Sequence, residues 1–304
     1  MIFIISPQKK KKRLKMLLYK RDVQVIIGDS DSAIKIPNDT AKDNLKIRFS
    51  LKINQSSSGS DNMIQIYNLK DTTQSFIGSR GTRVRLLAGY GGNLSLIYDG
   101  NIDHIDYVDR HTDKILNLYL VNKTFILTDS IFNRSYQKNV SAKTIVKDAI
   151  KSYSDAGLGV VNLDIIPDKS YSHFSFFGRT KDLLDKILSG LKIMWFVDQS
   201  TITFTKIGQN SDDESVLLTS DSGLIGYPYK SDKGINILSI FNSKIQVSKR
   251  IKLQLDKDSK SIDGRSQSQL RTELNGIYKA ISVHHHGDSI DGRMVTYIEA
   301  VRNS

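Results

Sequence analysis

The sequence predicts a mainly β protein of the α+β class, in which a small α/β module lies between two β-rich regions. Apolar and polar residues alternate over several short stretches before residue 121 and again after residue 215. Between these limits, two stretches have the three-and-four spacing of amphipathic helices. A length of 304 residues corresponds to about two domains at roughly 150 residues each.

The strand pattern begins at residue 45. Apolar residues occupy every second position over 45–53, which is typical of a strand with one buried face. The polar stretch 55–61 predicts a loop, and 63–69 predicts the returning strand of a hairpin. Further strands are predicted over 83–90, 94–99, 102–107 and 114–121, with a turn at Gly91 and Gly92.

Two helices are predicted in the middle of the chain. Ser141 is placed to cap a helix that ends near Gly157, and Thr180 is placed to cap a second one. The apolar faces of the two helices comprise Ala142, Ile145, Val146, Ala149, Ile150 and Tyr153 in the first, and Leu183, Leu184, Ile187, Leu188 and Leu191 in the second. A hairpin of strands 194–197 and 201–206 completes this module, with Trp195 as a core residue.

Strand patterns return after residue 215. Strands are predicted over 216–218, 235–241, 252–255, 277–285 and 294–301, and the polar segment 256–275 predicts a long loop. The pentapeptide Ser-Ile-Asp-Gly-Arg occurs at 261–265 and again at 289–293. Asp-Gly pairs favour tight turns, so two independent turns explain this repeat.

The positive charge is concentrated at the start of the sequence. The formal net charge is +12, and the first 21 residues contribute +8 because they contain eight Lys or Arg residues and no acidic residue. The remaining chain carries +4, which argues against a broad DNA-binding face. We expect residues 1–18 to form a disordered basic arm, with Met16 as a second plausible start; a nucleic-acid-binding protein led by this arm is an alternative. No apolar run approaches the roughly 18 residues of a membrane span, so no membrane insertion is expected.

Residues for chemistry are few. The absence of cysteine excludes disulfides, cysteine-based zinc sites and thiol nucleophiles. His284 and His286 would share one face of a strand near Asp288, so a metal-dependent hydrolase remains an alternative. Four carboxylates, Asp99, Asp103, Asp106 and Asp109, are interpreted as a solvated hairpin face. We therefore expect no catalytic residue, no metal and no cofactor, and the protein is not expected to be an enzyme.

The order of several strand ends resembles that of a known family. Tyr67-Asn-Leu69 is followed by a short helix, then by Ala88-Gly-Tyr90 and Gly100-Asn-Ile102, and later by Gly223-Leu-Ile-Gly-Tyr-Pro228. Gly276-Ile-Tyr278 and His286-Gly-Asp288 stand near the end. This order resembles the tail hub, or baseplate hub, proteins of tailed bacteriophages and related contractile particles.

The resemblance implies a structural tail hub protein. Two similar hub β-barrels, 19–121 and 207–304, would flank an α/β insertion module at 122–206. Three chains would form a pseudo-six-fold ring that adapts a six-fold tail tube protein to a three-fold, separate spike protein. The central channel would let tape-measure protein and DNA pass. Such a protein would belong to the virion tail or baseplate, or to a related tail-like particle, and would assemble in the host cytoplasm.

The resemblance also suggests positions for barrel turns or subunit contacts. These candidates are Tyr67, Asn68, Tyr90, Gly223, Gly226 and Pro228. Ordinary turn chemistry is the alternative explanation for the glycines and for Asn68, because both residue types are common at strand ends.

Overall fold

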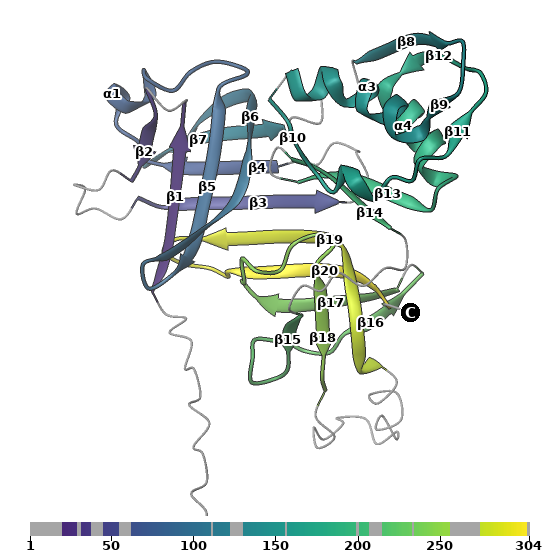
Figure 1. The fold of residues 1–304 in the computed structure, drawn as a ribbon. Helices are drawn as coiled ribbons and strands as arrows, with labels where there is room; N and C mark the ends of the chain where they lie inside the picture. Colours follow the sequence, from purple (N-terminus) through teal and green to yellow (C-terminus); the bar gives the residue numbers. More distant parts are fainter. Residues whose placement is uncertain are drawn as a thin grey trace, which may run out of the picture.

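The protein is represented by a computed structural model that describes most of the chain (Figure 1). The described residues are 20–28, 32–37, 45–54, 62–110, 112–121, 130–155, 157–198, 201–206, 215–232, 234–255 and 274–302. The predicted arm 1–18, the whole loop 55–61 and most of the loop 256–275 lie outside these ranges, as does the first copy of the pentapeptide at 261–265.

The first half of the chain forms seven strands and a short helix. Successive residues of β3 and β4 alternate between buried and more exposed positions, and the apolar residues of β3 are the buried ones, as its sequence predicts. The two strands form the expected hairpin. The bounds are β1 (Arg21–Ile27), β2 (Ile34–Ile36), β3 (Ile47–Asn54), β4 (Asn62–Tyr67), α1 (Asp71–Gln74), β5 (Arg83–Tyr90), β6 (Asn93–Arg110) and β7 (Asp113–Val121).

The prediction of two separate strands over 94–99 and 102–107 is wrong. Both stretches belong to the single strand β6, which runs through Gly100. A Cβ at Gly100 would contact the ring and hydroxyl of Tyr98, which is almost fully buried. The glycine therefore leaves room for a buried tyrosine and does not end the strand. The turn at Gly91 and Gly92 is confirmed, and both residues have positive φ, 61° and 85°.

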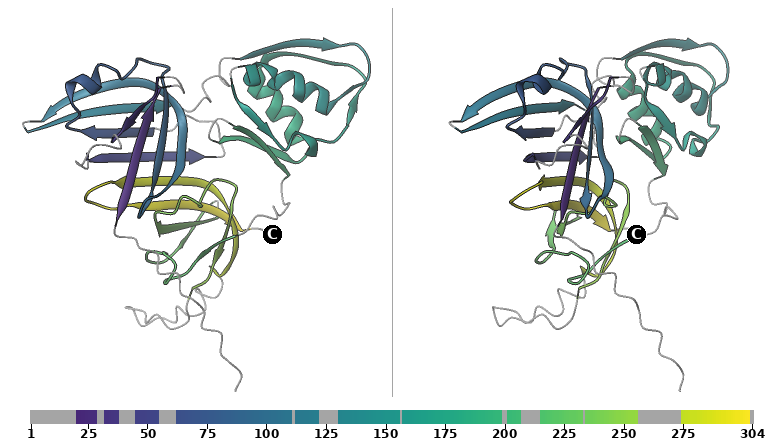
Figure 2. Two further views of the ribbon diagram at one scale, coloured as in Figure 1. Left: turned by 60° about the vertical axis from the view of Figure 1, so that its left-hand side comes forward. Right: turned by 90° about the vertical axis from the view of Figure 1, so that its left-hand side faces the viewer.

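The last part of the chain completes the same sheet. Its strands are β15 (Val216–Leu218), β16 (Tyr229–Ser231), β17 (Gly234–Ile240), β18 (Arg250–Leu253), β19 (Gly276–Asp288) and β20 (Val295–Arg302). Strand β19 pairs with β3 from Ser282 and Asn54 to Asp288 and Arg48, which joins the two β-rich regions (Figures 1 and 2). The strand path is β16-β17-β20-β19-β3-β4-β7-β6-β5-β1-β2, and β18 and β15 branch from β19.

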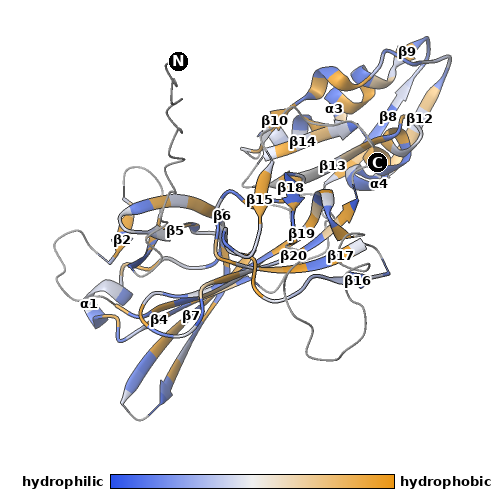
Figure 3. Cartoon of the chain, turned by 90° about the horizontal axis from the view of Figure 1, so that it is seen from below, coloured by the Kyte–Doolittle hydropathy of each residue, from blue (hydrophilic) through white to orange (hydrophobic). Residues whose placement is uncertain are grey.

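The mainly β, α+β class is thus confirmed. The path of paired strands has two ends, at β16 and β2, and does not close on itself among the described residues. The two separate hub barrels therefore remain a prediction. Seen from below, hydrophobic and hydrophilic segments alternate along the strands, most clearly in the projecting β6 and β7 hairpin (Figure 3).

The middle module packs two helices against short strands. Ser141 caps α3 (Ala142–Asp155) as predicted, because its Oγ accepts a hydrogen bond from the Thr144 amide at 3.1 Å. The predicted cap at Thr180 is wrong: α4 (Thr180–Ser189) starts at Thr180 itself, after an extended Arg179. Thr180 is buried, and its hydroxyl lies 2.9 Å from that of Ser130, so it fixes the helix to the preceding segment.

The remaining elements of the module are short. They are β8 (Ile131–Tyr136), β9 (Val140–Ser141), β10 (Gly159–Val161), a 3-10 turn η1 (Leu163–Ile165), β11 (Ser170–Tyr171), β12 (Phe174–Arg179), β13 (Ile193–Asp198) and β14 (Thr201–Lys206). Strands β13 and β14 form the predicted hairpin, and Trp195 packs partly buried against the apolar core of the module. Its indole Nε1 donates to Asp185 Oδ1 at 2.7 Å.

Three apolar cores stabilise the chain. One lies within the first β-rich region, one within the middle module and one within the last region. Phe241 and Met294 of the last region pack in the first core, and Ile53 packs in the last one, so the two β-rich regions share contacts. The predicted domain limits near 121 and 206 adjoin segments outside the described ranges and remain predictions. In the described residues, no helix is both long and apolar enough to cross a membrane.

Candidate assembly surface

The segment from Gly223 to Ser231 forms one edge of the large sheet. The Gly223 carbonyl accepts from the Ile240 amide at 2.7 Å, and the Ile225 amide donates to the Leu238 carbonyl at 2.8 Å. After Ile225 the chain turns away from β17, and from Tyr229 it pairs with β17 again as strand β16. Gly226 permits this turn, because its φ is 64° and the space beside its Cα is open. Pro228, between the turn and β16, is buried.

This edge carries three exposed apolar or aromatic side chains. Ile225 is 36% exposed, Tyr227 is 50% exposed and Tyr229 is 65% exposed. The glycines and the proline of this segment are predicted candidates, whereas these three side chains are not. The sequence does contain a signal for them, because Ile225, Tyr227 and Tyr229 occupy every second position and alternate with the turn residues Gly226 and Pro228. Since β16 ends the strand path, its outer side has no strand partner among the described residues.

A second edge lies on the β6 and β7 hairpin. Strand β5 pairs with β6 only as far as Arg83 and Asn101, so the part of β6 after Ile102 has β7 as its one strand neighbour in the described chain. This part of the hairpin projects beyond the rest of the sheet (Figures 2 and 3). Tyr107 lies on the same side of β6 as the core-packed Ile105, yet it is 56% exposed because no other part of the described chain covers it.

Two of the predicted candidates, Tyr67 and Asn68, lie together at the end of β4. The Tyr67 hydroxyl accepts from Arg48 Nη1 at 3.0 Å, and Lys46 and Arg48 each lie 5.4 Å from the centre of its ring. Asn68 has a left-handed φ of 53°. Its side chain donates to Asp113 Oδ1 and accepts from the Lys114 amide, both at 2.9 Å, which joins the end of β4 to the start of β7.

Tyr90 occupies a different position from the other candidates. Its ring centre lies 6.2 Å from that of Phe241, which also packs against Phe49 and His285. Burial raises the pKa of Tyr90, although the charge of Arg21 opposes this effect. Tyr90 therefore contacts the other β-rich region within the same chain. The six candidates thus belong to three places: the end of β4, the end of β5 and the edge at β16.

The histidines of β19 lie on both faces of the sheet. His284 and His286 share one face, with ring centres 6.4 Å apart, and His284 Nε2 lies 2.8 Å from Ser50 Oγ. His285 is buried on the opposite face, where its Nδ1 lies 2.9 Å from Thr296 Oγ1. Asp288 is engaged by Arg48, whose Nε lies 2.6 Å from Oδ2. The described residues contain no group of three His, Cys, Asp or Glu side chains placed to hold a metal ion.

The prediction that Asp99, Asp103, Asp106 and Asp109 form one solvated face is wrong for Asp99. Asp99 is buried, and it accepts two hydrogen bonds from Arg83, at 2.9 Å from Nε and 2.6 Å from Nη2. The sequence could not reveal this pairing because Arg83 and Asp99 meet only through the register of β5 and β6. Asp103, by contrast, is partly exposed and pairs with Arg80 at 3.1 Å.

Comparison with known proteins gives matches at the level of structure. No protein-family model and no curated protein sequence matches the chain. The 43 kDa tail protein of prophage MuSo2 from Shewanella oneidensis superposes with a TM-score of 0.59 at 9% identity, covering 93% of this chain and 97% of that one. A tail protein from Neisseria meningitidis MC58 gives a TM-score of 0.60 at 7% identity and covers 93% and 96%.

A third solved structure extends the comparison to secretion systems. It is an Escherichia coli component of the type VI secretion system described as structurally similar to the T4 bacteriophage tail proteins gp27 and gp5. Its TM-score is 0.54 at 11% identity, with 88% of this chain and 76% of that chain covered. The protein therefore has the fold of phage tail and baseplate proteins. The resemblance predicted from the order of the strand ends is confirmed at the level of the fold.

Proposed function

We propose that the protein is a structural tail hub that assembles as a trimeric ring and adapts a six-fold tail tube to a three-fold spike. The single observation that carries this proposal is that each of two sheet edges lacks a strand partner in the described chain: β16 at one end and β6 beyond Ile102 further along the same path. An unpaired edge exposes amides and carbonyls that another strand can satisfy. The shared fold with tail proteins supports the same conclusion.

The two edges differ from each other, so pairing between them would be head to tail. A head-to-tail contact generates a ring when the rotation between copies closes, and an open filament when it does not. The edge at β16 of one copy would meet the β6 edge of the next. The sheet would then continue from chain to chain and pair both of these edges, while β2 remains the other end of the path.

The side chains at these two edges suit a contact between copies. Tyr107 lies on the core side of β6 but is 56% exposed, and Ile225, Tyr227 and Tyr229 are exposed at the opposite edge. Burial of apolar surface yields about 25 cal/mol per Å², so covering these four side chains would favour assembly. Trimerisation would thus contribute to the stability of the sheet as well as to the ring.

The joined sheet also explains how three chains could match a six-fold tube. Strands β3 and β19 unite two β-rich regions in each chain, so three chains would present six such regions. The tail tube protein would bind on one side of this ring and a separate spike protein on the other. The protein would act without a cofactor as part of a virion tail or baseplate, or of a related tail-like particle, assembled in the host cytoplasm.

The face of the sheet turned away from the apolar cores supports a central channel. Its side chains are polar or ionic across β19 and β3, where they include His284 and Ser50. On β4 and β7 the same face combines Gln65 and Asn117 with Met63, Ile115 and Tyr119. The polar part over β19 and β3 would not hold apolar segments firmly. Tape-measure protein and DNA could therefore pass along it.

Light scattering after size exclusion tests the ring. We expect a mass of three times 34.2 kDa for the full chain, and ring-shaped, three-fold views by negative-stain electron microscopy. Because the chain has no cysteine, two single variants, Tyr107→Cys and Tyr229→Cys, can be mixed and treated with a short bis-maleimide. Head-to-tail pairing predicts a cross-linked dimer in the mixture and much less in either variant alone.

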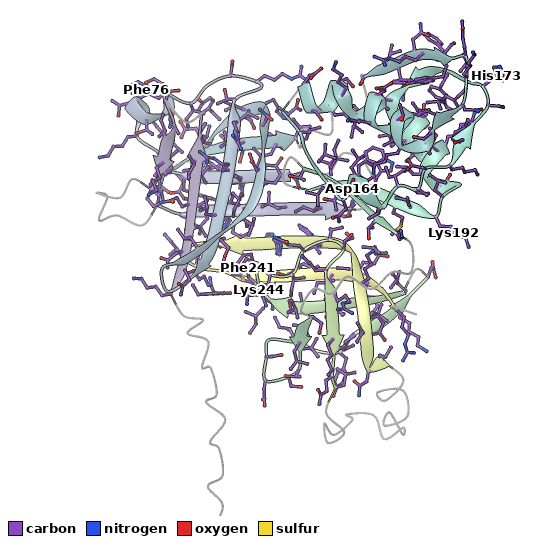
Figure 4. All side chains as sticks on the ribbon, in the orientation of Figure 1. Phe76, Asp164, His173, Lys192, Phe241 and Lys244 are labelled. Carbon is purple, nitrogen blue, oxygen red and sulfur yellow. The ribbon has the colours of Figure 1, made fainter. Side chains whose placement is uncertain are left out.

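The control replaces either partner with Phe76→Cys, because Phe76 is 73% exposed and lies away from both edges (Figure 4). This mixture should not give the cross-linked dimer. A folded protein that remains monomeric at every concentration would overturn the proposed ring. A trimer in which Tyr107→Cys and Tyr229→Cys do not cross-link would leave a ring but reject these two edges as its contact.

A further inference from the structure

Residues 241–249 join β17 to β18 and lie over the core side of the sheet, and we call this segment the strap. Phe241 packs in the first apolar core, whereas Ile245 and Val247 pack in the last one. All three side chains are buried. The strap therefore links the cores of the two β-rich regions, and Figure 4 shows its Phe241 beside β19 and β20.

Backbone hydrogen bonds anchor the strap to the sheet at its two ends. The Phe241 amide donates to the Met294 carbonyl at 3.0 Å, and the Ser248 amide donates to the Ala280 carbonyl at 2.8 Å. Between these anchors, the Ile245 amide donates to a carbonyl of the strap itself, at 3.1 Å. The middle of the strap is therefore held to the sheet mainly through side chains.

His285 of β19 is a polar contact beneath the middle of the strap. Its ring is 1% exposed, lies 5.3 Å from that of Phe241 and hydrogen-bonds the Ile245 backbone. Its Nδ1 lies 2.9 Å from Thr296 Oγ1, which also accepts a hydrogen bond from the Asn242 amide at 3.4 Å. The Thr296 hydroxyl can donate its proton to Nδ1 only while Nδ1 is unprotonated. These contacts therefore suit a neutral histidine.

A charged His285 would find no compensating carboxylate among the described groups that affect its pKa. The strap carries Lys244 and Lys249 and no Asp or Glu. Strand β3 faces the histidine with Leu51, and β20 faces it with a hydroxyl. Burial lowers the pKa of His285 to about 4, and the charge of His284 acts in the same direction. Protonation therefore opposes the closed position of the strap.

We propose that the strap is an acid-sensitive latch, which opens when His285 takes up a proton while the strands of the sheet stay paired. Opening lets water reach the charged ring, and it withdraws Phe241 from its packing against Phe49 and Tyr90. The two β-rich regions then keep the pairing of β3 with β19 but lose this shared packing. The latch concerns one chain by itself, so it does not depend on the proposed ring.

The open form should become more populated in mild acid. In water the ring has the ordinary histidine pKa of 6.5, against about 4 beneath the closed strap. The closed form is therefore fully favoured above pH 6.5 and loses this advantage as the pH falls towards 4. Linkage between the two pKa values raises the opening constant of the strap about 50-fold between pH 7 and pH 4.5.

Hydrogen exchange of the full chain, followed by mass spectrometry, tests the latch. Rates are corrected for intrinsic exchange at each pH, so that peptides covering the strap report its opening constant. We expect strap amides to exchange about tenfold faster than those of β3 and β4 at pH 7 in low urea, because the strand amides need global unfolding. Between pH 7 and pH 4.5 the opening constant should rise about 50-fold in the parent and in His286→Gln, and about threefold at most in His285→Gln.

Two results would overturn the latch. Equal exchange of the strap and of β3 and β4 at both pH values would mean that the strap opens only when the sheet unfolds. A 50-fold rise that survives in His285→Gln would assign the pH dependence to another group.

Thr296→Val replaces His285→Gln if that variant does not fold. Loss of the hydroxyl beside Nδ1 should raise the opening constant about threefold or more at pH 7, and an unchanged opening constant would reject His285 and its hydrogen bonds as the fastening of the strap. A failure of the ring to form affects none of these readouts.

Discussion

Arg48 and Asp288 lie 240 positions apart in the sequence, yet Arg48 Nε is 2.6 Å from Asp288 Oδ2. They face each other across the pairing of β3 with β19, which unites the two β-rich regions. Lys46 extends this ionic group, with its ammonium 2.7 Å from Asp291 Oδ1. The Asp288 side chain is 5% exposed, and its Oδ1 also accepts from the amides of Ile290 and Asp291. The carboxylate therefore fixes both the turn after β19 and the junction with β3.

Asp288→Asn should lower the free energy of unfolding by about 1.5–3 kcal/mol at pH 7, the range for hydrogen bonds to charged groups. Burial alone would raise the pKa of Asp288, but the hydrogen bond from Arg48 and those from the two amides hold it below its ordinary value of 3.8. A carboxyl with a lowered pKa stabilises the fold above its ordinary pKa and loses this contribution as the pH falls below it. Urea unfolding at pH 7 and pH 3 should show a smaller acid loss in Asp288→Asn than in the parent. Asp109→Asn, at an exposed carboxylate, should show the parent's loss.

His285 should make the protein less stable in mild acid. Burial, with a smaller effect from the charge of His284, lowers the pKa of His285 from 6.5 to about 4. Between these two pH values the imidazole therefore binds a proton in the unfolded chain but not in the folded chain. The contribution of neutral His285 to the free energy of unfolding is fully present above pH 6.5 and falls as the pH drops towards 4. The full loss is about 3 kcal/mol.

Urea unfolding of His285→Gln checks this pH dependence. The variant should have a flatter stability profile between pH 6.5 and 4.5, because it has no imidazole to protonate in the unfolded chain. His286→Gln, at the exposed neighbour, should keep the steep profile of the parent. Equal profiles for all three proteins would contradict the burial of His285.

Gly89→Ala should destabilise the β5 and β6 hairpin. A Cβ at Gly89 would overlap the backbone carbonyl of Asn93, and a backbone atom cannot rotate away as a side chain can. Overpacking of this kind costs about 1–3 kcal/mol. Thermal unfolding should show a lower midpoint for Gly89→Ala. Gly190→Ala, at a helical φ of −66° with only ordinary contacts, should equal or exceed the parent.

Asn68→Gly distinguishes a turn from a subunit contact. Glycine adopts the left-handed φ of 53° without strain but loses the hydrogen bonds to Asp113 and Lys114. If Asn68 serves the turn, the variant should lose about 1 kcal/mol of stability and keep the solution mass of the parent. A loss of assembly with unchanged stability would instead place Asn68 in a contact between copies. Light scattering and urea unfolding of the same preparation separate the two results.

Local signals predicted most elements correctly. The period-two pattern identified β3, and the helical spacing identified every buried apolar residue of α3, because both patterns depend on near neighbours in sequence. The errors arose where tertiary packing overrode a local rule. Gly100 is read locally as a strand end, but the ring of Tyr98 occupies the space beside it. Thr180 is read as a cap, but its hydroxyl bonds Ser130.

The candidate surfaces were predicted only in part. The segment Gly223 to Pro228 was selected for its turn residues, whereas its exposed Ile225, Tyr227 and Tyr229 were not. The β6 edge was not predicted at all. Exposure depends on what the rest of the chain covers, and alternation alone cannot distinguish a strand with two neighbours from one at an edge.

The sequence by itself determined the mainly β class, the position of the middle helices and the order of strand ends that resembles the tail hub family. Only the tertiary structure decided that β3 pairs with β19, that Asp99 is buried against Arg83, and that β16 and the end of β6 lack strand partners in the described chain. The physical reason is that side-chain periodicity follows from the backbone geometry of each strand, whereas the choice of a neighbouring strand depends on residues far apart in the sequence.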